Sequence, residues 1–157
     1  MTDQQQGLKM IVSGGQTGAD RAALDWAIEK GIPHGGWCPK GRKAEDGVIP
    51  DQYALQETSS PSYVSRTECN VLDSDGTVIF SLKPLLSGGS LQAAEFATRH
   101  GKPFLHLHQG TRSPAMKLKE FLSKHGIQTL NVAGPRASSE SAVGEFVITV
   151  LDETFSA

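Results

Sequence analysis

Residues 11–26 read IVSGGQTGADRAALDW, and this stretch is the strongest indication of the fold class. A short apolar run that begins at Leu8 stops at the pair Gly14-Gly15, and Gly18 follows just before a segment with helical spacing. A buried strand, a glycine turn and a helix in that order open an α/β domain. Because glycine has no Cβ, such a turn lets another group approach the backbone closely. The stretch therefore predicts a strand-to-helix corner that leaves space for another group beside its backbone.

The rest of the chain repeats this alternation. The first helix is predicted to have Asp20 as its cap and Gly31 as its stop, and Ser90 is predicted to cap a later helix. Strands that alternate with helices form a parallel sheet covered on both faces. We expect a single doubly wound Rossmann-like α/β domain with a five-stranded, mostly parallel sheet. The favoured strand order is 2-1-3-4-5, with 3-2-1-4-5 as the alternative. The strands are predicted at 8–13, 33–37, 77–82, 104–108 and 127–132, and the helices at 19–30, 62–72, 91–100, 114–125 and from about 139 onward.

Length and composition bound the class of protein. The chain has 157 residues, of which 38% are hydrophobic and 20% charged, and its formal net charge is −2. One domain over 8–157 is expected, preceded by a disordered tail over 1–7. The charge gives no general attraction to nucleic acid or to a membrane surface. No apolar run reaches the ~20 residues that span a bilayer, so a cytoplasmic protein is expected, with Cys38 and Cys69 as reduced thiols.

A second glycine pair, Gly88-Gly89, follows the predicted strand 77–82 and also leads into a helix. The N-terminus of a helix presents unpaired N–H groups and partial positive charge, so it attracts anions. Ligands of open parallel sheets bind beyond the carboxyl ends of the strands. Two glycine turns that face one crevice there predict a site for a phosphate or another oxyanion. The segment Cys38–Ser62 is long and polar, and its role stays open between a lid and an interface.

Other patterns are missing from the sequence. The turn GGQTGAD has no lysine of a nucleoside-triphosphatase loop and lacks the spacing G-x-G-x-x-G of a dinucleotide site. His106 and His108 share a strand face, but no third ligand is spaced to join them, so no metal site is predicted. No G-x-S-x-G elbow is present to indicate a serine hydrolase.

Five motifs together resemble the molybdenum cofactor carrier family. They are SGGQTGADRAALDWA, GGWCPKGRKAEDG, SDGTVIFS, SGGS and LNVAGPR, and they extend from about Met10 to Leu151. The family belongs to a Rossmann-like superfamily that also holds the lysine-decarboxylase-like phosphoribohydrolases. The resemblance implies a homo-oligomer, a dimer or a tetramer, that binds molybdenum cofactor (molybdopterin) or another phosphate-bearing ligand or nucleotide. Molybdoenzymes are then possible protein partners.

The candidate ligand-binding residues come from these motifs and from the two glycine turns. Trp37 is included because its ring suits a flat pterin, and the basic residues because they suit a phosphate. The set is Gly14, Gly15, Gln16, Thr17, Gly18, Arg21, Trp37, Lys40, Arg42, Ser87, Gly88, Gly89, Ser90, Asn131, Gly134 and Arg136.

Three functions are weighed against one another. The leading one is a cofactor carrier or storage protein without turnover. The alternative is a nucleotide-processing enzyme that hydrolyses an N-glycosidic bond, or a nucleotide sensor. The stretch SGGSLQAAE resembles the phosphoribohydrolase motif P-G-G-x-G-T-x-x-E in its glycine pair and in Glu95, but Ser87, Leu91 and Gln92 depart from it. Glu95 is therefore the only catalytic candidate, and binding is favoured.

Overall fold

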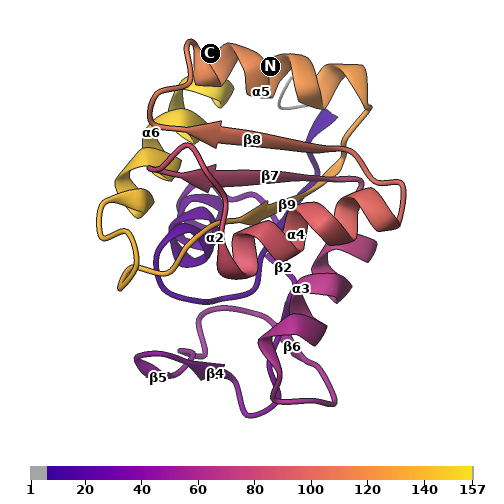
Figure 1. The fold of residues 1–157 in the computed structure, drawn as a ribbon, viewed down its shortest axis with the longest axis vertical. Coiled ribbons are helices and arrows are strands. Elements are labelled where there is room, and N and C mark those ends of the chain that lie inside the picture. Colours follow the sequence, from indigo (N-terminus) through magenta and orange to yellow (C-terminus); the bar gives the residue numbers. More distant parts are fainter. Residues whose placement is uncertain (1–6, 157) are drawn as a thin grey trace.

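The computed structural model describes residues 7–156, so most of the tail expected over 1–7 lies outside the described residues. Five parallel strands form one sheet, with helices against both of its faces (Figure 1). The Rossmann-like α/β fold predicted from the sequence is confirmed. The sheet consists of β1 (Met10–Val12), β2 (His34–Gly35), β7 (Gly76–Ser81), β8 (Phe104–His108) and β9 (Thr129–Ala133). The helices are α2 (Ala19–Lys30), α3 (Tyr63–Leu72), α4 (Gly88–Arg99), α5 (Pro114–Lys124) and α6 (Val143–Phe155).

The order of the strands differs from both predicted orders. It is β2-β1-β9-β7-β8, so the last strand of the chain lies at the centre of the sheet between β1 and β7. Both predicted orders had placed that strand at an edge. The burial of the strands gives the physical reason, because Leu130, Asn131 and Val132 of β9 are buried while Phe104 of the edge strand β8 is 39% exposed.

The two faces of the sheet are packed by different helices. Val78 and Phe80 of β7 belong to the main core with residues of α2, α5 and α6, whereas Ile79 packs against Ala93 and Ala94 of α4. Successive side chains of a strand point to opposite faces, which is why neighbouring residues of β7 enter different cores. Helices α3 and α4 contact each other on this second side, as Figure 1 shows.

The local signals of the helices were mostly read correctly. Helix α2 has its predicted bounds and ends at Gly31 in the left-handed conformation, and Pro114 stands in the first turn of α5. Two predicted helix N-caps were wrong. Asp20 makes no cap hydrogen bond and Gly18 is the N-cap, whereas α4 begins at Gly88, so that Ser90 is inside the helix. The glycines of the second turn are thus the first turn of the helix itself.

The segment 38–62 is ordered by short strands and a small core of its own. Strand β3 (Trp37–Cys38) pairs with β6 (Gln56–Glu57), and β4 (Lys43–Ala44) forms a hairpin with β5 (Gly47–Val48). Arg42 organises the segment, because its guanidinium donates to the carbonyl oxygens of Ile49 (3.1 Å), Pro50 (2.8 Å), Tyr53 (2.9 Å) and Leu55 (3.4 Å). Figure 1 shows the hairpin below the sheet and its helices, and of its four strand residues only Ala44 is buried.

No helix within residues 7–156 combines the length and the apolar character that crossing a bilayer requires.

Candidate functional site

A pocket of about 350 Å³ lies at the carboxyl edge of the central sheet, and we call it the carboxyl-edge pocket. Its volume falls in the range of small-molecule sites. Residues from the loops after β1, β7 and β9 meet in it, together with one face of α3. It is lined by Gln16, Asp20, Tyr63, Arg66, Thr67, Lys83, Ser87, Gly88, Gly89, Ser90, Gln92, Ala133, Gly134, Pro135, Arg136, Ser138, Ser139 and Glu140.

The Gly88-Gly89 turn opens onto this pocket. A Cβ built on either glycine would meet no heavy atom within 4 Å. Gly88 has a φ of +54°, which favours glycine, and both residues are exposed. The first N–H groups of α4 therefore stand beside open space, where an anion can approach them without steric obstruction.

The first glycine pair has a different environment. A Cβ on Gly14 would collide with the guanidinium of Arg66, and a Cβ on Gly15 would lie 2.5 Å from Cδ1 of Leu55. The space beside this corner is therefore filled by the protein's own side chains. Gly14 and Gly15 are buried and do not line the carboxyl-edge pocket, whereas their neighbour Gln16 does.

Gly18 and Gly134 bring the first and last loops together. A Cβ on Gly18, whose φ is +83°, would lie 2.5 Å from the carbonyl oxygen of Pro135, and one on Gly134 would lie 2.5 Å from Cβ of Ala19. The amide of Ala19 also donates to the carbonyl of Pro135 at 3.2 Å. These close approaches place Arg136 and Ser138 at the rim of the pocket.

Cationic side chains gather around Tyr63. The guanidinium of Arg136 lies 4.4 Å from the centre of the Tyr63 ring, that of Arg66 lies 5.9 Å away, and Nζ of Lys43 lies 5.1 Å away. Lys83 adds a further positive charge from the loop before α4. Neither Lys83 nor Arg136 forms a direct ion pair with a residue of the described range 7–156. Arg136 is attracted by Glu45 only from beyond ion-pair distance, so both cations can still pair with an anion.

Two acidic side chains of the pocket already have partners. Asp20, which is 2% exposed, accepts from the amide of Gln16 at 3.2 Å and pairs with Nη1 of Arg66 at 3.3 Å. Burial raises the pKa of Asp20, while the Arg66 charge and the backbone donors act in the opposite direction. Glu140 accepts from the amide of Leu82 at 2.5 Å. Both carboxylates hold loops in place.

Most of the other predicted residues lie outside the pocket. Trp37 donates from Nε1 to Asp73 at 2.6 Å, and Asn131 is buried in the sheet, where it donates to Thr77 at 3.1 Å. Lys40 is exposed on the outer segment. Arg42 is engaged with carbonyl groups, as described above. Arg21 donates to Asp46 at 2.5 and 2.8 Å. Ligand contacts by these residues stay predictions without a geometric argument.

Glu95 also lies apart from the carboxyl-edge pocket. It is exposed on α4 and lines a shallow groove with Ala94, Thr98 and Arg99. Gly88 and Glu95 thus line different surface depressions. The hydrolytic role of Glu95 stays a prediction that the lining of the pocket does not support.

The sequence reasoning missed Tyr63, Arg66, Lys83 and Ser138. Lys83 stands five residues before Gly88, so its place in the same loop was a usable signal. Arg66 and Tyr63 come from α3, which reaches the pocket only through tertiary packing, and no local pattern indicated that. Among residues 7–156, no group of three or more His, Cys, Asp or Glu side chains is arranged to hold a metal ion. Cys38 and Cys69 are free cysteines, as expected.

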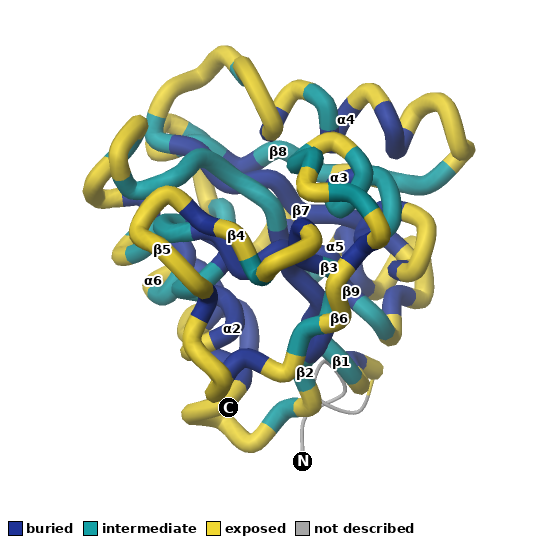
Figure 2. The backbone as a smooth tube through the Cα atoms, turned by 90° about the horizontal axis from the view of Figure 1, so that it is seen from below, coloured by how far each residue is buried: buried dark blue, intermediate teal, exposed yellow. Residues whose placement is uncertain are grey.

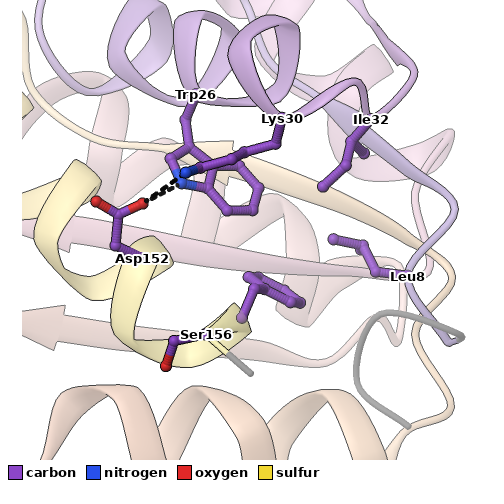
Figure 3. A pocket seen from close by; sticks show the side chains of 7 residues that line it. Leu8, Trp26, Lys30, Ile32, Asp152 and Ser156 are labelled. Carbon is purple, nitrogen blue, oxygen red and sulfur yellow. Dashed lines mark hydrogen bonds and ion pairs between the residues drawn. The ribbon is translucent and has the colours of Figure 1, made fainter. Parts of the chain in front are cut away.

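A larger pocket, of about 530 Å³, lies at the opposite, amino edge of the sheet (Figure 3). Leu8, Trp26 and Ile32 contribute apolar surface to it. Asp152 accepts from Nε1 of Trp26 at 2.8 Å and pairs with Lys30 at 3.7 Å. Size alone would favour this pocket, but none of its described lining residues begins a helix, and Lys30, the cation among them, is already paired. The carboxyl-edge pocket is the better site for an anion.

Comparison with known proteins agrees with the fold and with the resemblance seen in the sequence. A crystal structure described as "Putative molybdenum carrier protein" from Syntrophus aciditrophicus is 46% identical, with a TM-score of 0.93 and coverage of 96% of each chain. No curated protein matches the chain. The model of the circularly permutated YpsA SLOG family matches residues 11–155. Since that match spans nearly the whole chain, the protein belongs to the circularly permutated YpsA SLOG family.

Proposed function

We propose that the protein binds a small phosphate-bearing anion in the carboxyl-edge pocket and acts as its carrier, with molybdenum cofactor as the ligand. The observation that carries the proposal is the open N-terminus of α4 at Gly88 and Gly89, flanked by the unpaired charges of Lys83 and Arg136. Backbone N–H groups at a helix start and nearby cations are the donors that phosphate prefers.

The donor set fits the phosphate end of such a ligand. The hydroxyls of Ser87 and Ser90 line the pocket beside the two glycines. A guanidinium pairs with phosphate and also stacks on flat rings, so Arg136 suits either end of a pterin phosphate. The name of the similar crystal structure supports molybdenum cofactor as the ligand.

Retention of the cofactor by the purified protein tests this function. Molybdenum cofactor is mixed with the protein, the mixture is passed through a gel-filtration column, and the retained pterin is measured after oxidation. We expect Lys83→Ala and Arg136→Ala each to weaken binding about tenfold, which is about 1.4 kcal/mol. Lys124→Ala removes the same charge from α5, outside the pocket, and serves as the control.

The carrier function is rejected if the wild type retains no cofactor. It is also rejected if the two pocket variants retain as much as Lys124→Ala, because binding would then not use the pocket. AMP in place of the cofactor tests a nucleotide as the ligand. Tighter binding of AMP than of cofactor would move the function to nucleotide sensing.

A further inference from the structure

The hairpin of β4 and β5 places a carboxylate against Ser138, a residue that lines the carboxyl-edge pocket. Glu45, at the tip of the hairpin, accepts from Oγ1 of Thr17, from the amide of Ser138 at 3.3 Å and from Oγ of Ser138 at 2.5 Å. Ser138 lines the pocket, and Thr17 follows the pocket residue Gln16. A side chain from the outer segment thus bridges the first and last loops of the site.

The donors that hold Glu45 form a set that suits oxyanions in general. Two hydroxyl groups and one backbone N–H converge on its carboxylate, and Arg136 is close enough to add an electrostatic attraction. The same contacts hold the pKa of Glu45 below its usual range, with Ser138 and Thr17 as the main causes. A phosphate oxygen makes the same demands on its surroundings as a carboxylate oxygen.

Other contacts of the hairpin do not depend on Glu45. Asp46 forms its own ion pair with Arg21, and Gln16 donates from Nε2 to the carbonyl of Lys43 at 2.9 Å. Ala44 packs into the small core with Leu24 and Ile49. Release of the Glu45 carboxylate would therefore remove one of the two side-chain anchors of the tip, while the Asp46–Arg21 ion pair and the base of the hairpin stay in place. In Figure 2 most of the hairpin is coloured as exposed.

We propose that Glu45 is a built-in competitor of the ligand: its carboxylate occupies an oxyanion subsite made by Thr17 and Ser138, and an anionic ligand displaces it. This inference rests on the proposed function, because it concerns the same pocket. A tethered group competes at an effective concentration set by its short connection. The apparent affinity for the ligand is then lowered by the fraction of molecules in which the subsite is occupied. For a carrier, the return of Glu45 assists release of the ligand.

Titration with inorganic phosphate tests the competition directly. The dissociation constant is measured by calorimetry for the wild type, Glu45→Gln and Glu45→Ala. We expect both variants to bind phosphate about three- to tenfold more tightly, because the subsite is no longer occupied by a carboxylate. Glu57→Gln is the matched control, since Glu57 is an exposed carboxylate of the same segment that accepts from the amide of Gly41. It changes the net charge equally and should leave the affinity unchanged.

Hydrogen exchange of residues 43–48 supplies a second readout. In the wild type, phosphate should speed exchange at the hairpin tip, and Glu45→Gln should show the faster exchange without phosphate. If the wild type binds phosphate and the Glu45 variants bind equally or more weakly, the competitor role is overturned and the carrier function stands. If neither the wild type nor the variants bind phosphate, both proposals fall. An equal gain in Glu57→Gln would also overturn the competitor role, because net charge would then explain it.

Discussion

At the scale of single residues, the two glycine turns serve different purposes despite their similar sequences. Arg66 and Leu55 occupy the space that Gly14 and Gly15 leave, while nothing fills the space beside Gly88 and Gly89. The sequence could predict that both corners needed glycine. It could not predict which corner opens onto a pocket, because Arg66 arrives from α3 through tertiary packing.

Gly18 should be intolerant of a side chain. We expect Gly18→Ala to lower the free energy of unfolding by about 3 kcal/mol, since the residue has a φ of +83° and its new Cβ would collide with the backbone at Pro135. Gly89→Ala is the matched control, because its Cβ meets open space in the first turn of α4. Its stability should stay within about 1 kcal/mol of the wild type. Urea denaturation measures both. Equal stability of the two variants would contradict the packing described for Gly18.

His106 should make stability depend on pH. Burial lowers the pKa of His106, with His108 nearby acting in the same direction, and Nε2 lies 2.6 Å from Oγ of Ser81. Below a pH of about 6.5 the unfolded chain takes up this proton before the folded protein does. The contribution of His106 is therefore complete above that pH and is lost as the pH falls toward its folded pKa.

Thermal unfolding between pH 8 and pH 5 checks the role of His106. The melting temperature of His106→Gln should fall less steeply on acidification than that of the wild type, because glutamine does not titrate. Parallel curves for the two proteins would rule out the role of this histidine.

At the scale of elements, the helices were easier to predict than the strand order. Apolar spacing, Gly31 and Pro114 are local signals, and they gave α2 and the start of α5 correctly. Strand order depends on contacts between distant segments, and both predicted orders were wrong. One clue was present: β8 reads FLHLH, with two half-buried histidines that suit an edge, whereas LNVA of β9 suits the centre. The composition of β8 and β9 was therefore a usable signal for their places in the sheet.

The outer segment 38–62 should depend on Tyr53 for its attachment. The Tyr53 hydroxyl donates to Asp25 of α2 at 2.6 Å, and burial together with this bond raises the pKa of Tyr53 to about 12. We expect Tyr53→Phe to cost about 1 kcal/mol, the usual net value of one hydrogen bond. Its partner Asp25 is exposed and can be hydrated instead. Urea denaturation measures the loss, and proteolysis should cut the segment faster. An unchanged unfolding midpoint and cleavage rate would show that the bond does not hold the segment.

At the scale of the whole molecule, the pocket forms because all five strands of the sheet run parallel. Their carboxyl ends share one edge, so loops that are far apart in the sequence meet there. The central place of β9 between β1 and β7 brings Gly134 and Arg136 into the pocket between the two glycine turns. The sequence predicted the edge and several lining residues, including Gln16, Ser87 and Arg136. It could not predict the contribution of α3.

Titration of ¹⁵N-labelled protein with inorganic phosphate, followed by NMR, tests directly whether the carboxyl-edge pocket binds an anion. An anion at the start of α4 should shift the amide signals of Gly88, Gly89 and Ser90 first, and the side-chain signal of Arg136 with them. The indole signal of Trp26, in the amino-edge pocket, should stay in place. Shifts confined to Trp26 and its neighbours, or no shifts at millimolar phosphate, would contradict the assignment of the carboxyl-edge pocket as the anion site.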